Sequence, residues 1–336
     1  MAAPAVAKGP RLELVFRGQA IVPTGTTFQG TTVGGLSSIT YDRGRGVFYT
    51  LSDDPSQFQA ARFYTVALDV SDGRLADGDV RFRRVTTLLA PDGQPYPPFS
   101  LDPEGLALTK DRELILTSEG VANSLIDPFV RRYSLHGVFL GSLPVPEAFL
   151  PTADHSRGVR QNLGFESAGV APDGRFLFTA TENALIQDGP AATLANGSPA
   201  RLLRYNLKTG RLERQWIYVT DPIAEAPVPA TQFAVNGLVE LLPLNNNFLI
   251  AMERSFSVGA PDTGNTIKLY TVRLTRRTAE KRLLLNLDTL GIPLDNVEGM
   301  TFGPRLPDGR RSVVLVSDNN FAAAQFTQFL LFALEK

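Results

Sequence analysis

Short runs of alternating apolar and polar residues occupy most of the chain, and residues 102–120 show their common form. Residues 102–108 begin with an acidic residue and are rich in small side chains, whereas residues 113–120 are strongly apolar and carry Glu119 near their end. Lys110, Asp111 and Arg112 form a polar break between the two runs. This pattern predicts two β-strands joined by a tight turn.

The same pair of runs occurs five times, so the sequence is organised as an internal repeat. The first runs are residues 35–42, 102–108, 165–174, 235–243 and 296–302, and the second runs are residues 46–54, 113–120, 175–183, 247–254 and 312–319. Two further runs with period-two alternation follow each of the first four pairs, as is typical of half-exposed outer strands. Each repeat therefore supplies four strands, which is the blade of a β-propeller.

The predicted fold is an all-β propeller with five four-stranded blades, or six if a long connection hides a divergent copy. The last repeat has only a third strand, at residues 328–334, while residues 12–21 form a strand without a partner nearby in the sequence. Pairing these two strands in one blade would close the propeller and leave no open sheet edge. Residues 1–10 are expected to be disordered, and residues 11–336 to form a single propeller domain. The alternative is a β-sandwich or two separate sheet domains.

Composition narrows the classes of function and of site. The 336 residues are 43% hydrophobic and 20% charged with a net charge of −1, so nothing points to nucleic acid or an anionic membrane as a partner. The absence of cysteine excludes disulfides, thiolate metal sites and cysteine nucleophiles, and two histidines argue against a zinc site. The chain has no apolar run of the roughly 18 residues that a membrane helix needs. We expect a monomer.

The first residues suit a mature exported protein whose signal peptide has been removed, because residues 1–8 have neither a charged n-region nor an apolar h-region. We therefore expect a periplasmic or extracellular location. The alternative is the disordered N-terminus of a cytosolic protein.

Acidic residues recur at equivalent places in the repeats. The first strand of each propeller blade lines the central channel, and alignment of the copies puts one residue from each at the same position: Ser37, Glu104, Glu166, Asn236 and Glu298. The second strands end on acidic residues: Asp53, Asp54, Glu119, Glu182, Glu253 and Asp318. Carboxylates collected at one place repel each other unless cations, arginines or raised pKa values compensate. Oxygen ligands without thiols favour Ca²⁺ or Mg²⁺.

The candidate metal ligands are six of these acids: Asp53, Glu104, Glu119, Glu166, Glu182 and Glu298. Glu104, Glu166 and Glu298 are also the catalytic candidates, because the small residue after each would leave room near the propeller axis. The alternative is structural, since carboxylates at strand ends also accept hydrogen bonds from loop N–H groups and join adjacent blades.

Basic residues near the acidic strand ends have two interpretations. They would either bind a phosphate oxygen or pair with carboxylates, and we expect pairing for this group: Arg62, Arg201, Arg204, Arg254 and Lys268. His155 lies in a polar loop and is expected at the surface, although it could serve as an acid, a base or a ligand. The chain has no Gly-x-Ser-x-Gly elbow, P-loop or Rossmann fingerprint, so a triad serine hydrolase lacks support.

Taken together, several of these segments resemble the phytase-like domain family, whose members are often labelled "esterase-like activity of phytase". The resemblance runs from about residue 14 to residue 334 and rests on residues 35–42, 51–55, 103–107, 116–120, 165–169, 180–183 and 296–300. It implies a β-propeller, frequent export and a metal-dependent phosphoesterase relationship. Asp53, Asp54 and Pro55 resemble one acidic element of the distantly similar β-propeller phytases, which use several Ca²⁺ ions, and Glu104 with Gly105 resembles another. The chain departs from those phytases in blade number and lacks their basic substrate-binding residues in matching order.

Three functions follow as hypotheses. The first is a Ca²⁺-dependent hydrolase of a small-molecule phosphate ester, working outside the cytoplasm through the channel carboxylates. The second is a non-catalytic binding propeller stabilised by a metal, because propellers host unrelated functions on one fold. The third is a lactonase-like propeller that uses a metal on carboxylic esters.

Overall fold

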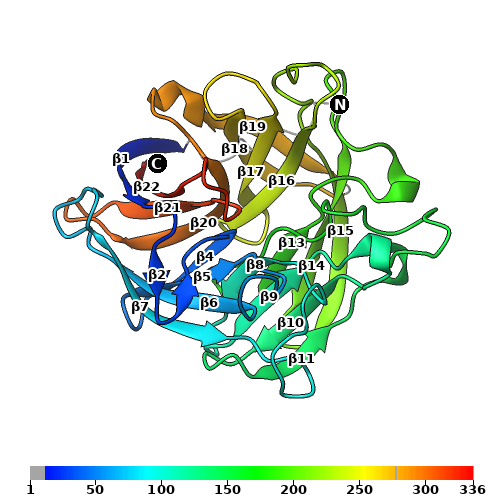
Figure 1. Cartoon of the computed structure of the whole chain (residues 1–336), viewed down its shortest axis with the longest axis horizontal. Helices are drawn as coiled ribbons and strands as arrows, with labels where there is room; N and C mark the ends of the chain where they lie inside the picture. Colours follow the sequence, from blue (N-terminus) through cyan, green and yellow to red (C-terminus); the bar gives the residue numbers. More distant parts are fainter. Residues whose placement is uncertain (1–11, 277, 336) are drawn as a thin grey trace, which may run out of the picture.

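The chain forms a β-propeller of five blades, each a four-stranded antiparallel sheet (Figure 1). The structure is a computed structural model that describes residues 12–276 and 278–335. The predicted all-β fold is confirmed, and the described residues form five blades, without a sixth. The segment 1–10, expected to be disordered, lies outside the described residues.

The strands run from the centre of the propeller outward in each blade. Blades 1 and 2 contain β4 (Ser38–Asp42), β5 (Val47–Ser52), β6 (Arg62–Leu68), β7 (Val80–Thr87), β8 (Pro103–Leu108), β9 (Leu114–Ser118), β10 (Phe129–Tyr133) and β11 (Phe139–Leu143). Blades 3 and 4 contain β12 (Gly169–Val170), β13 (Phe176–Ala180), β14 (Pro199–Asn206), β15 (Arg211–Val219), β16 (Ala234–Pro243), β17 (Phe248–Ser257), β18 (Asn265–Leu274) and β19 (Ala279–Asn286). Blade 5 contains β20 (Asn296–Arg305), β21 (Arg311–Asp318), β22 (Thr327–Glu335) and β1 (Glu13–Val22).

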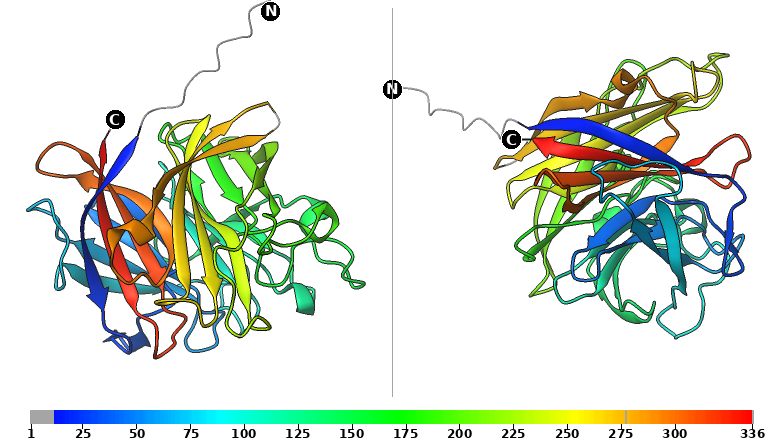
Figure 2. Two further views of the ribbon diagram at one scale, coloured as in Figure 1. Left: turned by 90° about the horizontal axis from the view of Figure 1, so that it is seen from above. Right: turned by 90° about the vertical axis from the view of Figure 1, so that its left-hand side faces the viewer.

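The two ends of the chain close the propeller, as the sequence predicted. Strand β1 pairs antiparallel with β22, so that Glu13 lies opposite Glu335 and Val22 opposite Thr327. Figure 2 shows β1 in blue beside β22 in red. Because β1 covers β22, blade 5 has the same four-stranded form as the others and β22 presents no free edge.

Apolar layers between neighbouring blades form the core, and β22 shows how one strand serves two layers. Leu330, Phe332 and Leu334 pack into the layer shared with blade 4. Phe329, Leu331 and Ala333, which alternate with them, pack into the layer shared with blade 1. Successive side chains of a strand point to opposite faces, so a strand buried on both faces is apolar throughout.

The inner strand of blade 3 is shorter than the predicted run 165–174 because only β12 (Gly169–Val170) joins the sheet. The Ser167 hydroxyl accepts a hydrogen bond from the Ala180 N–H at 3.0 Å, in place of a backbone carbonyl. The Ala168 N–H is directed away from the sheet to the Glu240 carboxylate at 3.3 Å. These side-chain contacts draw residues 167 and 168 out of the ladder, whereas the Glu166 N–H still donates to the Ala180 carbonyl at 3.2 Å.

Most of the longer connections lie at one end of the propeller, which we call the loop face, whereas the link 69–79 between β6 and β7 lies at the other end. In an up-and-down blade, the loop between the second and third strands and the link to the next blade emerge at the same end. The loop face comprises residues 23–37, 53–61, 88–102, 119–128, 144–168, 181–198, 220–233, 258–264, 287–295 and 319–326. It includes the short strands β2 (Thr27–Phe28) and β3 (Thr31–Thr32) and the 3₁₀ turns η1 (Ala122–Ser124), η2 (Glu147–Phe149), η3 (Ile186–Asp188) and η4 (Leu287–Leu290).

Candidate carboxylate site

The acidic residues of the repeats gather at the loop-face end of the central strands. Asp53 directly follows β5, and Glu119 directly follows β9. Asp102 directly precedes β8, and Glu104 lies within it. Glu166 lies just before β12. Because inner strands begin where second strands end, these five side chains come from three blades to one place.

Five acidic residues form what we call the carboxylate cluster: Asp53, Asp102, Glu104, Glu119 and Glu166. One carboxylate oxygen each of Asp53, Asp102 and Glu104 lies within 4.8 Å of the other two, and the same holds for Glu104, Glu119 and Glu166. Glu104 therefore belongs to both groups and stands at the middle of the cluster. Asp53 and Asp102 are half-buried, whereas the three glutamates are buried, so the two aspartates form the open side.

A β-bulge and a glycine direct Glu104 into the cluster. The pairing of β8 with β9 shifts register between Pro103 and Leu106, and such bulges re-aim side chains. A Cβ added to Gly105 would lie 2.7 Å from the carbonyl carbon of Ser167 in the neighbouring blade. The glycine is thus needed because the chains of blades 2 and 3 approach closely at this point. The sequence alone indicated only that the small residue would leave room near the propeller axis.

The positive charges and hydrogen-bond donors of the described residues do not fully compensate the negative charge of the cluster. Burial raises the pKa of Asp102 to about 6. Burial, together with repulsion from neighbouring carboxylates, also raises the pKa values of Asp53, Glu104, Glu119 and Glu166. Asp53 Oδ1 and Glu119 Oε2 are buried without a hydrogen-bond partner among the described residues. Buried, unpaired acceptors in an all-oxygen group fit a hard divalent cation such as Ca²⁺.

Arg254 pairs with the other two predicted ligands, Glu182 and Glu298, beside this cluster. Its Nη2 lies 2.8 Å from Glu298 Oε1 and 3.6 Å from Glu182 Oε1. Burial opposes the charge of Arg254, but the three carboxylates of Glu298, Glu182 and Glu166 outweigh it and raise its pKa. Burial raises the pKa of Glu182 to about 7 even though Arg254 lowers it. Blade 4 thus contributes the positive charge of Arg254 at the centre, next to acids from other blades. Metal binding by Glu182 and Glu298 stays a prediction.

Other aligned positions leave the centre. Ser37 donates to the backbone carbonyl of Glu104 at 3.0 Å. Asn236 donates to Glu253 Oε2 at 3.1 Å, and Glu253 is also bound by Lys281 and by the Tyr218 hydroxyl at 2.6 Å. The Ser37 contact joins blade 1 to blade 2, the Tyr218 contact joins blade 3 to blade 4, and the other two lie within blade 4. The structural interpretation therefore holds for this part of the alignment.

The expected pairing of the basic residues is confirmed. Each contacts a carboxylate: Arg62 with Asp54 at 2.7 Å, Arg201 with Asp188 at 2.6 Å, Arg204 with Glu213 at 3.2 Å, Arg254 with Glu298 at 2.8 Å and Lys268 with Asp221 at 3.6 Å. His155 is exposed, as expected for a surface histidine.

Glu240 is a buried acid that the alignment of repeats missed. It lies in β16 at a register shift between Leu238 and Glu240, and its carboxylate accepts hydrogen bonds from the Ser38 hydroxyl at 3.3 Å and from the Ala168 and Leu241 N–H groups at 3.3 and 2.8 Å. It therefore joins the inner strands of blades 1, 3 and 4. The available signal was a single acid inside the apolar run 238–242.

Replacement of Glu240 by leucine is expected to lower the free energy of unfolding by about 1–3 kcal/mol, because the Ala168 N–H would be buried without an acceptor. Glu240→Gln keeps an acceptor oxygen and should cost less than about 1 kcal/mol. Urea unfolding of both variants measures the difference. Equal stability of the two variants would show that the carboxylate does not join the strands.

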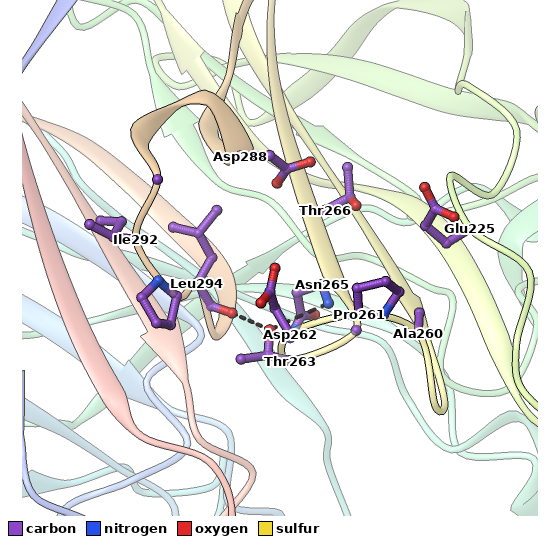
Figure 3. A pocket seen from close by; sticks show the side chains of 13 residues that line it. Glu225, Ala260, Pro261, Asp262, Thr263, Asn265, Thr266, Asp288, Ile292 and Leu294 are labelled. Carbon is purple, nitrogen blue, oxygen red and sulfur yellow. Dashed lines mark hydrogen bonds between the residues drawn. The ribbon is translucent and has the colours of Figure 1, made fainter.

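A pocket of about 390 Å³ lies elsewhere on the loop face, where residues 258–264 approach η4 and the start of blade 5 (Figure 3). Its lining includes the acids Glu225, Asp262 and Asp288, and the Thr263 hydroxyl donates to the Leu294 carbonyl. None of its lining residues belongs to the carboxylate cluster.

Comparisons with known proteins agree with this architecture. A family model described as "Phytase-like: Esterase-like activity of phytase" matches residues 31–321. An uncharacterized secreted protein of Arthroderma benhamiae is 24% identical over 180 residues, which are 45% of this chain and 34% of that protein. The match thus spans about a third of the length of that relative.

Two solved structures are also similar over most of both chains. An endo-arabinase from Bacteroides thetaiotaomicron has 14% identity and a TM-score of 0.48, with 94% of this chain and 97% of that chain covered. A periplasmic gluconolactonase from Pseudomonas aeruginosa has 13% identity and a TM-score of 0.39, with 96% of each chain covered.

Proposed function

The chain belongs to the phytase-like family, and from this premise we propose that it is a calcium-dependent hydrolase of phosphoric esters. The observation that carries the proposal is the carboxylate cluster, with its two overlapping groups and its unpaired buried oxygens. A purely structural cluster would be expected to pair its acids with arginines or loop N–H groups, as Asp54 and Glu298 do here. In the carboxylate cluster, Glu119 Oε1 accepts from the Gly164 N–H, but Glu119 Oε2 and Asp53 Oδ1 have no partner among the described residues.

The cluster suits a divalent cation held by Glu104 together with Asp53, Asp102, Glu119 and Glu166. When bound, such an ion would stabilise charge that develops on a phosphoryl oxygen and lower the pKa of a water molecule. Hydrolysis then joins the water oxygen to phosphorus and breaks the bond from phosphorus to the ester oxygen, and the released alcohol takes up a proton. The five acids would bind the ion. Asp53 and Asp102, which are half-buried, would face the substrate.

Arg254 limits where this site can extend. Since it pairs with Glu298 and Glu182, it compensates those two acids and keeps them oriented beside the cluster. We therefore assign the site to Asp53, Asp102, Glu104, Glu119 and Glu166, with Arg254 as a fixed positive boundary.

Glu104→Gln is expected to reduce calcium-dependent turnover of phenyl phosphate on the order of 100-fold, because Glu104 is shared by both carboxylate groups. Turnover is measured with purified protein in calcium and after EDTA treatment. Glu240→Gln is the matched control, since it also replaces one buried central glutamate and should keep the wild-type rate.

Other outcomes would select the remaining hypotheses. Thermal stabilisation by calcium without turnover of any ester would favour a binding propeller. Calcium-dependent opening of lactones without hydrolysis of phosphate esters would favour a lactonase-like enzyme. Turnover by Glu104→Gln at the wild-type rate would remove the cluster from the reaction.

We also propose that the protein works outside the cytoplasm. The relative in Arthroderma benhamiae is described as secreted, and this chain contains no cysteine that an oxidising compartment could cross-link. Among the described residues, no helix is long and apolar enough to cross a membrane.

A further inference from the structure

Three phenylalanines border the open side of the carboxylate cluster. Phe58 and Phe99 are 53% and 54% exposed, which is unusual for side chains of this size, and Phe321 is half-buried. The rings of Phe58 and Phe321 lie 4.8 Å apart between centroids. The backbone of Phe99 lies next to the segment that carries Phe58, because the Phe99 N–H donates to the Pro55 carbonyl at 2.7 Å.

Contacts of the backbone place these rings next to Asp53 and Asp102. A Cβ added to Gly35 would lie 2.8 Å from Phe321 Cε2 and 3.0 Å from the Asp53 carbonyl oxygen, so the ring and Asp53 flank the same glycine. Phe99 precedes Asp102 by three residues in the same loop. The Phe321 ring, with Phe58 packed on it, therefore lies beside the backbone of Asp53, and Phe99 lies in the loop that leads to Asp102. Asp53 and Asp102 are the half-buried members of the cluster.

Two of the three phenylalanines adopt a backbone conformation that disfavours a large side chain. Phe99 has φ +59° and Phe321 has φ +52°, where glycine or asparagine is usual. Folding alone would be served better by a small polar residue at an exposed, left-handed loop position. Strained residues of this kind cluster at sites that bind ligands.

Three arginines at the loop-face end of the propeller already have partners, which restricts the charge that a substrate can bring. Arg62 is 1% exposed and pairs with Asp54, and its guanidinium lies 5.8 Å from the centre of the Phe321 ring. Arg254 pairs with Glu298. Arg160 donates to the carbonyl oxygens of Ala184 and Gly189. A substrate with many phosphates would find these arginines occupied, whereas one phosphate with an apolar substituent would not need them.

We propose that Phe58, Phe99 and Phe321 form a subsite for the aromatic group of an aryl phosphate monoester, whose phosphate lies at the carboxylate cluster. The inference rests on the proposed function and names its substrate class. The rings would pack against the aryl group by apolar burial and by edge or offset stacking. The phosphate would then face Asp53 and Asp102 across the bound cation.

Binding of two non-hydrolysable phosphonates tests the subsite apart from turnover. In calcium, phenylphosphonate is expected to bind about tenfold more tightly than methylphosphonate, because only the phenyl group can pack on the three rings. The double variant Phe58→Ser with Phe99→Ser should reduce this preference to about threefold or less. Isothermal titration calorimetry measures both affinities. Phe233→Ser is the matched control, because Phe233 is 61% exposed on the loop face before blade 4, away from blades 1 and 2.

The outcomes separate this inference from the proposed function. Equal binding of the two phosphonates, or an unchanged preference in the double variant, overturns the phenylalanine subsite. In that case calcium-dependent turnover of glycerol phosphate would still support the hydrolase. Absence of phosphonate binding together with absence of turnover overturns both.

Discussion

Calcium is expected to raise the melting temperature of this protein by roughly 4–6 °C at pH 8 and by much less at pH 5. An ion that binds only the folded chain at 100 to 1,000 times its dissociation constant contributes about 3–4 kcal/mol. The carboxylate cluster provides the binding site, and its unpaired oxygens, Asp53 Oδ1 and Glu119 Oε2, provide the reason for a large effect.

The pH dependence follows from the raised pKa values. Burial raises the pKa of Asp102 to about 6 and that of Glu182 to about 7, above the value of about 4 in an unfolded chain. The metal-free folded state therefore binds more protons than the unfolded state, and its stability falls as the pH rises from about 4 to about 7. Calcium competes with protons on Asp102 and on the other cluster carboxylates, whose pKa values burial also raises, so its stabilising effect grows as the pH rises.

Differential scanning calorimetry at pH 5 and pH 8, with calcium and with EDTA, measures this linkage. The double variant Glu104→Gln with Glu166→Gln should melt at a higher temperature than the wild type in EDTA at pH 8, because two repelling charges are gone. It should also lose most of the calcium effect. A calcium shift that is the same at both pH values, or the same in the variant, would contradict binding at the cluster.

The propeller could be predicted because its signal is repeated and local. Each copy pairs a small-residue strand with an apolar one, and β22 is apolar on both faces because both contact neighbouring blades. The short inner strand of blade 3 could not be predicted, since it depends on Ser167 and on Glu240, which is distant in the sequence. Contacts of that kind have no periodicity.

The candidate site could be predicted only as a set of acids. In blade 4 the sequence placed Glu253 at the acidic strand end, whereas the structure directs Arg254 to the centre and Glu253 to Tyr218. Neighbouring residues in a strand face opposite sides, so a difference of one residue exchanges a negative charge for a positive one. Asp102 stands beside Glu104 in the sequence, but it lies outside the aligned position, so the alignment of repeats did not select it.

Removal of β1 is expected to abolish cooperative unfolding of the whole propeller. This strand pairs along its length with β22, from Glu13 opposite Glu335 to Val22 opposite Thr327, and Phe16 packs against Phe332. Without it, a long apolar strand would become an open sheet edge, which favours aggregation. Size-exclusion chromatography and thermal unfolding followed by circular dichroism should show aggregates or a chain without a sharp transition.

A circular permutant tests whether the pairing of β1 with β22 matters, or only the covalent link from β1 to blade 1. Since Glu13 lies opposite Glu335, a short Asn-Gly turn can join the end of β22 to the start of β1. The permuted chain would then begin at residue 23 and end at residue 22. Blade 5 would then be built from consecutive strands, and the permutant should unfold as cooperatively as the wild type. A stable, monomeric protein without β1 would contradict closure as a source of stability. Failure of the permutant would mean instead that the native link from β1 to blade 1 is itself required.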